Sequence, residues 1–180
     1  MSARPDWRDV PLHGRLLVEA SAGTGKTWTM AALYLRLLLD GISRATADDA
    51  GSDDGNGRVP LAPERIVVAT YTDAAAQELG ERLRARVTQA LRLAQETTPA
   101  FDASDPVQAW LGDRWIDPNQ RATDAQRLRR ALAGLDRAPI GTLHGLCHRL
   151  LLDHPLDGGL GFSPPALGDG RRVHEAIARD

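Results

Sequence analysis

The sequence ASAGTGKT, residues Ala20–Thr27, decides the fold that we expect of this chain of 180 residues. Its final Gly-Lys-Thr matches the phosphate-binding loop pattern, although Ala stands where that pattern usually begins with Gly. The preceding run, Arg15–Ala20, is short and mostly apolar, which is typical of a buried strand. The residues that follow predict a helix from about Lys26 to Asp40 with almost no polar face. A strand, a glycine-rich loop and a helix in this order favour an α/β fold with a parallel sheet flanked by helices.

The loop carries the residue types that hold a nucleoside triphosphate and its metal ion. Gly23 and Gly25 permit a sharp turn whose backbone N–H groups point at phosphate oxygens. Lys26 is suited to reach the β- and γ-phosphates, and the Thr27 hydroxyl to ligate Mg²⁺. Lys26 is also the single lysine among 22 basic residues, and a compact ammonium suits this role better than a guanidinium. The expected ATP and Mg²⁺ site, with Lys26 and Thr27 as its catalytic residues, comprises Ala20, Ser21, Ala22, Gly23, Thr24, Gly25, Lys26 and Thr27.

Polar residues follow a second expected strand, Arg65–Thr70. Thr70, Tyr71 and Thr72 come at its carboxyl end, where ligands bind to open parallel sheets. The Tyr71 ring is suited to stacking on a nucleobase, and the threonines to bonding a phosphate. A helix is expected from near Asp73, capped by Thr72 or Asp73. Ordinary packing of a strand, a turn and a helix is the alternative interpretation of this block.

A third block follows a short expected strand, Pro139–Thr142, and its polar residues are Thr142 and His144. Cys147 lies on an apolar stripe, so we expect it to be buried rather than to act as a nucleophile. His144 and His148 are one helical turn apart, but no further ligand of suitable spacing completes a metal site.

The remaining segments complete the alternation of strands and helices. The segment Leu143–Leu152 has the apolar spacing of an amphipathic helix. Thr123 and Gln126 form a capping-box pattern, which predicts that another helix begins there; the stretch 97–119 is expected to be irregular with a short helix. The acidic segment Gly41–Pro63 predicts a solvated, mobile insertion. The expected units are a lead-in (1–14), a partial ATP-binding domain (15–153) that contains the insertion 41–63, and a Gly/Pro-rich tail with the start of a helix (154–180).

The composition indicates a folded, soluble and intracellular chain. Apolar residues make up 42% and charged residues 26%, with a formal net charge of −2, so wholesale disorder is not expected. Aromatic residues make up only 4%, so the core is expected to consist of Leu, Val and Ala. The single cysteine excludes an internal disulfide. No apolar run is long enough to span a bilayer, and the first residues lack a signal-peptide pattern, so we expect a cytoplasmic protein without membrane association.

Together the three blocks resemble, in order and character, the first helicase motifs of UvrD-like superfamily-one DNA helicases. The resemblance covers about Pro11–Leu152, and within the family it is greatest to the RecB-like branch, the beta subunits of exodeoxyribonuclease V. The first block is highly specific, whereas the other two are specific mainly in combination. The blocks are EASAGTGKTWTMAALYLRLLL (Glu19–Leu39), VVATYTDAAAQELGERL (Val67–Leu83) and IGTLHGLCHRLL (Ile140–Leu151).

This resemblance implies a P-loop NTPase fold of the RecA-like type, of which the chain would hold an incomplete first motor domain. It implies that the first block binds ATP and Mg²⁺. It further implies a parent 3′-to-5′ helicase that acts on DNA in double-strand-break repair, together with RecC- and RecD-like subunits. The single-stranded DNA path would then be lined by Thr70, Tyr71, Thr72, Thr142 and His144.

Two departures from the family pattern bear on function. His13 stands where the family commonly has a glutamine that reads adenine, so His13 is the candidate adenine contact. No apolar strand ending in Asp-Glu follows the third block, although such a pair would hold Mg²⁺ and orient the attacking water. We therefore expect these 180 residues to bind ATP and DNA with negligible ATPase activity and no unwinding.

Two other classes of function remain open from the residues alone. One is a small P-loop kinase, which would need a lid with arginines; the candidates lie on the exposed side of an expected helix and are Arg127, Arg129 and Arg130. The other is a non-catalytic module that binds a nucleotide or partner subunits.

Overall fold

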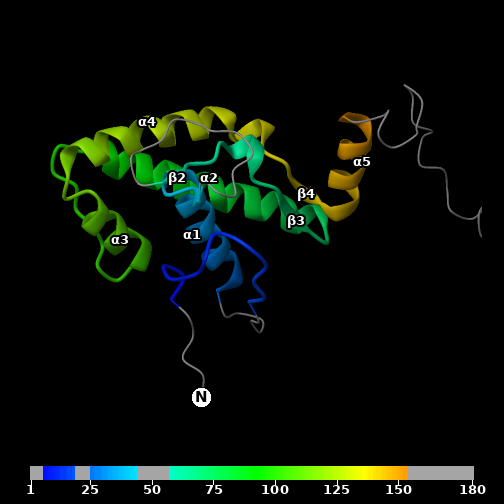
Figure 1. Cartoon of the computed structure of the whole chain (residues 1–180), viewed down its shortest axis with the longest axis horizontal. Helices are drawn as coiled ribbons and strands as arrows, with labels where there is room; N and C mark the ends of the chain where they lie inside the picture. Colours follow the sequence, from blue (N-terminus) through cyan, green and yellow to red (C-terminus); the bar gives the residue numbers. More distant parts are fainter. Residues whose placement is uncertain (1–5, 19–24, 44–56, 154–180) are drawn as a thin grey trace, which may run out of the picture.

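The computed structural model describes residues 6–18, 25–43 and 57–153, and within them the chain is mixed α/β (Figure 1). The elements, in chain order, are α1 (Lys26–Leu39), β1 (Ile42–Ser43), β2 (Arg58–Val59), the 3₁₀ helix η2 (Pro63–Arg65), β3 (Val68–Thr70), α2 (Asp73–Gln95), α3 (Pro106–Arg114), α4 (Pro118–Gly134), the 3₁₀ helix η3 (Leu135–Arg137), β4 (Ile140–Thr142) and α5 (Leu143–Asp153).

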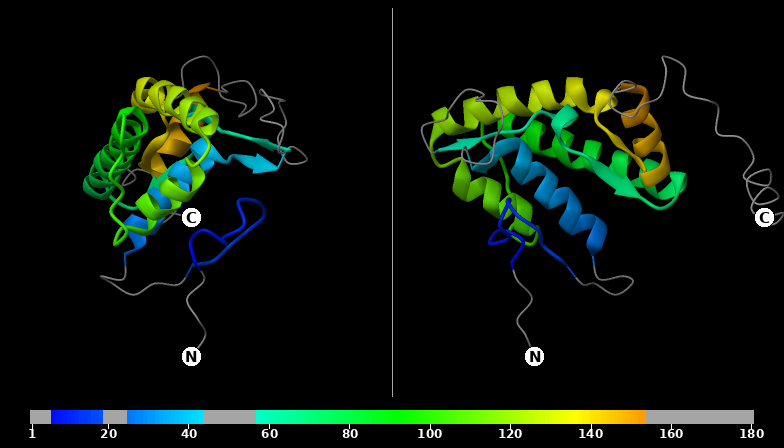
Figure 2. Two further views of the ribbon diagram at one scale, coloured as in Figure 1. Left: turned by 90° about the vertical axis from the view of Figure 1, so that its left-hand side faces the viewer. Right: turned by 45° about the vertical axis from the view of Figure 1, so that its right-hand side comes forward.

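Helices α1, α2 and α4 enclose the core. The long helices α2 and α4 lie along each other, and α1 packs against both (Figures 1 and 2). Leu, Val and Ala supply most of the buried side chains, as predicted, but two tryptophans and one tyrosine are also buried. The largest fully buried apolar side chains are Leu35, Leu39, Leu83, Val87, Val107, Leu111 and Leu128.

The parallel sheet consists of β3 and β4, which are joined through α2, α3 and α4. Val68 pairs with Ile140, and Thr70 pairs with Thr142. Val68 is buried, whereas Ala69 is exposed, because side chains alternate between the faces of a strand and the described residues cover one face of β3. The prediction of a sheet covered on both faces is therefore wrong for the part of the chain that the structure describes.

The predicted strand Arg15–Ala20 is wrong over its described residues, 15–18. These residues form no strand, and Leu17 is 81% exposed. A buried parallel strand needs hydrogen-bonding neighbours and cover on both faces. In the described chain β3 pairs with β4 alone, so residues 15–18 have no strand beside them. The second predicted strand, Arg65–Thr70, is shorter in the structure. Arg65 ends the 3₁₀ helix η2, and the strand β3 begins only at Val68.

The helix predicted from Lys26 is confirmed, and so is the helix predicted from Asp73. The predicted start of α4 at the Thr123–Gln126 capping box is wrong. Asp117 caps this helix and Pro118 opens it, because Asp at the cap and Pro at the first position together form a stronger start signal. Thr123 lies inside the helix, where its Oγ1 donates to the Asn119 carbonyl at 2.9 Å.

The ends of the predicted insertion, 41–63, are ordered rather than mobile. Strands β1 and β2 form an antiparallel hairpin in which Ile42 pairs with Val59. Gly41 enters it with φ of +70°, and a Cβ there would overlap the Val59 carbonyl. The hairpin thus requires glycine at this position, while the middle of the insertion, 44–56, lies outside the described residues.

Helix α5 is present as predicted, but most of its apolar stripe is uncovered. Leu146 is buried, whereas Leu150 is 59% exposed. Cys147 is also exposed, so its predicted burial is wrong: apolar spacing identifies one face of a helix but not what covers that face. Within the described ranges, no helix combines the length and apolarity that crossing a membrane requires.

Candidate functional site

The described part of the phosphate loop is the start of α1. Gly25 precedes the helix with φ of +84°, a conformation that residues with a Cβ rarely adopt. Gly25 offers no side-chain cap, so the first backbone N–H groups of α1 receive no hydrogen bond from an N-cap side chain; amides at this position of a helix are suited to bind an anion. Residues 20–24, which include the predicted ligands Ala20, Ser21, Ala22, Gly23 and Thr24, lie outside the described residues.

The described residues fit a triphosphate with a magnesium ion. Lys26 is exposed and Thr27 is half-buried at the first turn of α1, so an ammonium and a hydroxyl stand beside the uncapped amides. Nothing lies within 4 Å of the position that a Cβ would take on Gly25. His13, the candidate adenine contact, is exposed on the segment that precedes the loop. The roles of Lys26, Thr27 and His13 toward a nucleotide remain predictions.

The parallel pairing of β3 and β4 brings the second and third blocks together. Thr70 lies directly opposite Thr142 in the register, so the turn after β3 and the start of α5 lie at the same edge of the sheet. Tyr71 is 98% exposed there, and His144 is exposed as well. The sheet therefore presents one aromatic ring and one imidazole at its carboxyl edge.

The three threonines of these blocks are used to hold local structure. The Thr72 Oγ1 accepts from the Ala75 backbone N–H at 3.2 Å and caps α2. The Thr142 Oγ1 accepts from the Gly145 N–H at 3.2 Å in the first turn of α5. The Thr70 hydroxyl donates to the Thr72 carbonyl at 3.0 Å. A nucleic-acid contact at this edge thus depends mainly on the Tyr71 and His144 side chains.

Metal-ligating side chains are not clustered in the described residues, where no group of three His, Cys, Asp or Glu could hold an ion. His144 is exposed and His148 is half-buried on α5, with no third ligand beside them. The Mg²⁺ ligand that the sequence predicts among the described residues is the Thr27 hydroxyl. In P-loop proteins this hydroxyl holds the ion together with the phosphates of the nucleotide.

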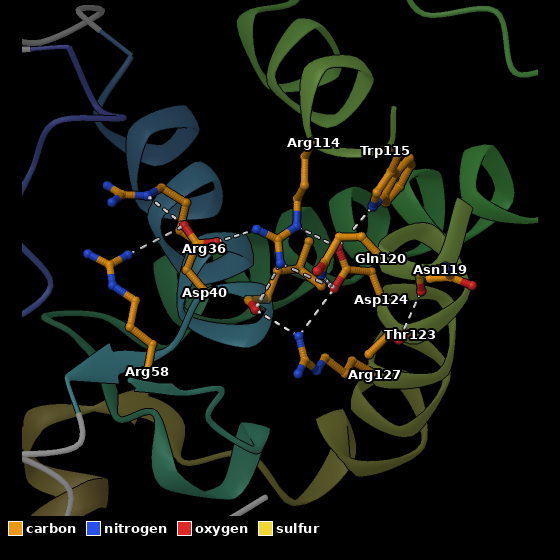
Figure 3. Close-up of polar contacts among 11 residues, drawn as sticks. Arg36, Asp40, Arg58, Arg114, Trp115, Asn119, Gln120, Thr123, Asp124 and Arg127 are labelled. Carbon is orange, nitrogen blue, oxygen red and sulfur yellow. Dashed lines mark hydrogen bonds and ion pairs between the residues drawn. The ribbon is translucent and has the colours of Figure 1, made fainter. Parts of the chain in front are cut away.

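A buried ion network joins the end of α1 to α3 and α4 (Figure 3). Asp124 is fully buried, and its carboxylate accepts from Arg114 Nε at 2.5 Å and from Trp115 Nε1 at 2.9 Å. Arg114 also donates to Asp40, which follows the last turn of α1. Burial by itself lowers the pKa of Arg114, but the hydrogen bonds and charges of Asp124 and Asp40 raise it overall. The sequence analysis missed this network, because its members lie far apart in the chain.

Arg127 belongs to the same network rather than to an exposed surface. Its Nη1 donates to the Leu39 carbonyl at 3.2 Å and to Asp124 Oδ1 at 3.3 Å. The prediction that this arginine lies on the exposed side of an ordinary amphipathic helix is therefore wrong. Arg129 and Arg130 are exposed, as predicted.

A second group that the sequence analysis missed fixes the lead-in segment on α1. Arg36 is buried, and its Nη1 donates to the Trp7 carbonyl at 2.7 Å and to the Val10 carbonyl at 3.0 Å. Burial lowers the pKa of Arg36. An arginine within an apolar helix was the available sequence signal, since buried arginine needs specific partners.

Comparisons with known proteins find one family over most of the chain. Residues 7–166 match the UvrD/REP helicase N-terminal domain. The chain is 34% identical over 164 residues to RecBCD enzyme subunit RecB of Haemophilus influenzae, and 38% identical over 162 residues to RecBCD enzyme subunit RecB of Escherichia coli. Each of these two matches covers 89% of this chain but only 12% of the relative.

Proposed function

Because the chain belongs to the UvrD/REP helicase N-terminal domain family, we propose that it is the ATP- and DNA-binding N-terminal part of a RecB-like, ATP-dependent 3′-to-5′ DNA helicase subunit. The observation that carries this proposal is the Gly25-Lys26-Thr27 sequence at the uncapped start of α1. The chain spans only 12% of the length of the first two RecB relatives. The parent's role in double-strand-break repair in the cytoplasm, and its assembly with RecC- and RecD-like subunits, are thus parts of the proposal.

The nucleotide site is formed by the start of α1 and the loop before it. The Lys26 ammonium neutralises charge on the terminal phosphates, and the Thr27 hydroxyl ligates Mg²⁺. The uncapped N–H groups of the first turn bind phosphate oxygens, and the helix dipole adds a favourable field. His13 contacts the adenine. ATP with Mg²⁺ supplies the phosphoryl-transfer chemistry in the parent protein.

The DNA-binding surface is the carboxyl edge of β3 and β4. Tyr71 stacks on a base, because its ring is almost fully exposed beside a polar turn. His144 adds a second ring, while Thr70, Thr72 and Thr142 hold the turns that present both side chains. In this proposal β3 and β4 are part of a RecA-like parallel sheet, within a partial motor domain that spans residues 15–153.

These 180 residues bind ATP without turning it over at a significant rate. They contain no Asp-Glu pair, so the carboxylates that would complete the metal site and orient water are absent from this sequence. The kinase alternative is disfavoured because Arg127 is held by Asp124 and the Leu39 carbonyl, which removes it from a mobile lid.

Titration of the chain with ATP and Mg²⁺ tests the proposal. Lys26→Ala should weaken binding at least about tenfold, because one charge-assisted contact to phosphate is lost. Arg129→Ala, which removes an exposed cation from α4, is the matched control and should leave the affinity unchanged. Equal affinity of the Lys26→Ala variant would refute the proposed site. Phosphate release with single-stranded DNA present should remain close to the uncatalysed background.

A further inference from the structure

The start of α1 is held by a tryptophan that directly follows the phosphate-binding residues. Its N-cap residue, Gly25, makes no side-chain hydrogen bond, and its first turn carries Lys26 and Thr27. Trp28 comes next, and its ring lies edge-to-face against Trp7 with centroids 6.0 Å apart at 89°. On α2, the Arg86 guanidinium lies 6.0 Å from the Trp28 ring centroid. The first turn of α1 is thus anchored from the side through Trp28.

Trp7 is fixed in turn by two independent groups. Its ring packs edge-to-face on Trp110 of α3, with centroids 5.5 Å apart at 81°. Its backbone carbonyl and that of Val10 accept from the buried Arg36. The lead-in turn is therefore attached to α1 at two points, through Trp28 at the start of the helix and through Arg36 in its later turns. Figure 1 shows this segment, in dark blue, beside the start of α1.

The burial of Trp7 leaves one polar group without a hydrogen bond, and the packing of the ring must offset this loss. Trp7 is 7% exposed, and its Nε1 has no hydrogen-bond partner in the structure as described. An unsatisfied buried donor is unfavourable, so the ring is retained for its aromatic contacts. Three of the four tryptophans of the chain thus form one cluster, in which the Trp7 ring contacts both Trp28 and Trp110. Trp28 places this cluster next to Lys26 and Thr27.

We propose that Trp7 and Arg36 are positioning residues for nucleotide binding: they clamp the lead-in against Trp28 and so hold the first turn of α1 in its phosphate-binding conformation. This inference rests on the proposed function of Lys26 and Thr27. Helix termini fray unless they are tied down. A pre-ordered turn binds phosphate more tightly, because binding then does not have to order it.

The test compares two buried tryptophans in the full chain. Trp7→Ala removes the clamp, whereas Trp115→Ala removes a similarly buried ring that contacts Phe101 and Asp124 instead. Inorganic triphosphate with Mg²⁺ is the probe, because it reports the phosphate subsite without the base. Hydrogen exchange of the amides of residues 29–32, whose hydrogen bonds close the first turn beginning with Thr29 to the Gly25 carbonyl, reports the order of that turn relative to α2.

We expect Trp7→Ala to weaken triphosphate binding about tenfold, since two aromatic contacts that order the turn are lost. It should also speed exchange at residues 29–32. Trp7→Phe should restore most of both properties, and Arg36→Lys should lie between Trp7→Ala and the unmodified chain. Trp7→Ala and Trp115→Ala should lower the denaturation midpoint by similar amounts, because both remove a buried ring. Trp115→Ala should nevertheless leave the triphosphate affinity within about twofold, because its contacts lie away from the first turn of α1.

Two results would overturn the inference: Trp7→Ala with unchanged affinity and exchange, or Trp115→Ala with the same loss of both. Equal triphosphate affinity of the unmodified chain and Lys26→Ala would instead refute the proposed function. In that case the exchange comparison between Trp7→Ala and Trp115→Ala still decides whether the clamp orders the start of α1.

Discussion

The two tyrosines of the chain occupy opposite environments. Tyr71 is 98% exposed at the carboxyl end of β3, whereas Tyr34 is 3% exposed within α1. The exposed ring has no packing role in the described structure that would explain an aromatic residue there, so it is available to a ligand. The buried ring packs in the core, but its hydroxyl has no hydrogen-bond partner in the described residues. We therefore expect Tyr71 to affect DNA binding and Tyr34 to affect stability.

Tyr71→Ala should weaken single-stranded DNA binding by about tenfold, because one base-stacking platform is lost. Tyr71→Phe should retain the affinity, since the ring rather than the hydroxyl makes the contact. Fluorescence anisotropy with a labelled oligothymidine measures both variants, and Ile116→Ala, another exposed apolar residue, serves as the control. Equal affinities of the Tyr71→Ala and Ile116→Ala variants would exclude the ring as a DNA contact.

The buried Tyr34 should make the fold less stable at alkaline pH. Burial raises the pKa of Tyr34 to about 12, from an ordinary value of 10.0. Because the folded-state pKa lies above the unfolded one, this contribution to stability is complete below about pH 10 and is lost as the pH rises toward 12. Tyr34→Phe should remove this loss in urea denaturation, while Tyr71→Phe should leave it in place. A loss of stability between pH 10 and 12 that persists in Tyr34→Phe would contradict this assignment.

At the scale of elements, the sequence predicts what local patterns determine. The helices that begin at Lys26 and Asp73 were predicted because apolar periodicity and caps are local signals. Residues 15–18 were misassigned because an apolar run does not reveal whether neighbouring strands are present. The α5 face was misjudged for the same reason: Leu150 has the spacing of a buried residue, yet it lies exposed.

The β1–β2 hairpin is an element that the sequence analysis did not predict, and it depends on Gly41. Gly41→Ala should lower the free energy of unfolding by about 2 kcal/mol or more, because the new Cβ would combine a strained positive φ with backbone overlap. Gly57→Ala is the matched control: its φ is also positive, +67°, but its surroundings are open. Urea denaturation measures both, and equal losses would show that the conformation rather than the Val59 contact sets the cost.

At the scale of the whole molecule, the helices share an apolar core, and buried charged side chains add a second connection between three of them. Asp124 and Arg114 join α3 to α4, and Asp40 extends the connection to α1. Arg36 then attaches the lead-in to α1. Asp124 and its partners lie far apart in the chain and leave no local sequence signal, so the start of α1 and the polar carboxyl edge of β3 and β4 could be predicted, whereas this network could not.

Asp124→Asn tests this connection, because it leaves Arg114 and Arg127 without their buried carboxylate. We expect the free energy of unfolding to fall by about 3 kcal/mol. Asp136→Asn removes an exposed carboxylate that pairs with Arg84 and should cost less than about 1 kcal/mol. Chemical denaturation of the two variants measures the difference, and equal effects would show that the buried network contributes no more to stability than an exposed ion pair.

Affinity labelling tests most directly whether the start of α1 binds the terminal phosphates of ATP. Lys26 is the only lysine in the 180 residues, so an acyl-phosphate derivative of ATP, which transfers its acyl group to a nearby amine, has one lysine to modify. We expect mass spectrometry to find the label on Lys26 and excess ATP with Mg²⁺ to prevent it. Labelling of Lys26 that excess ATP does not reduce, or label confined to the α-amino group, would contradict binding at this position.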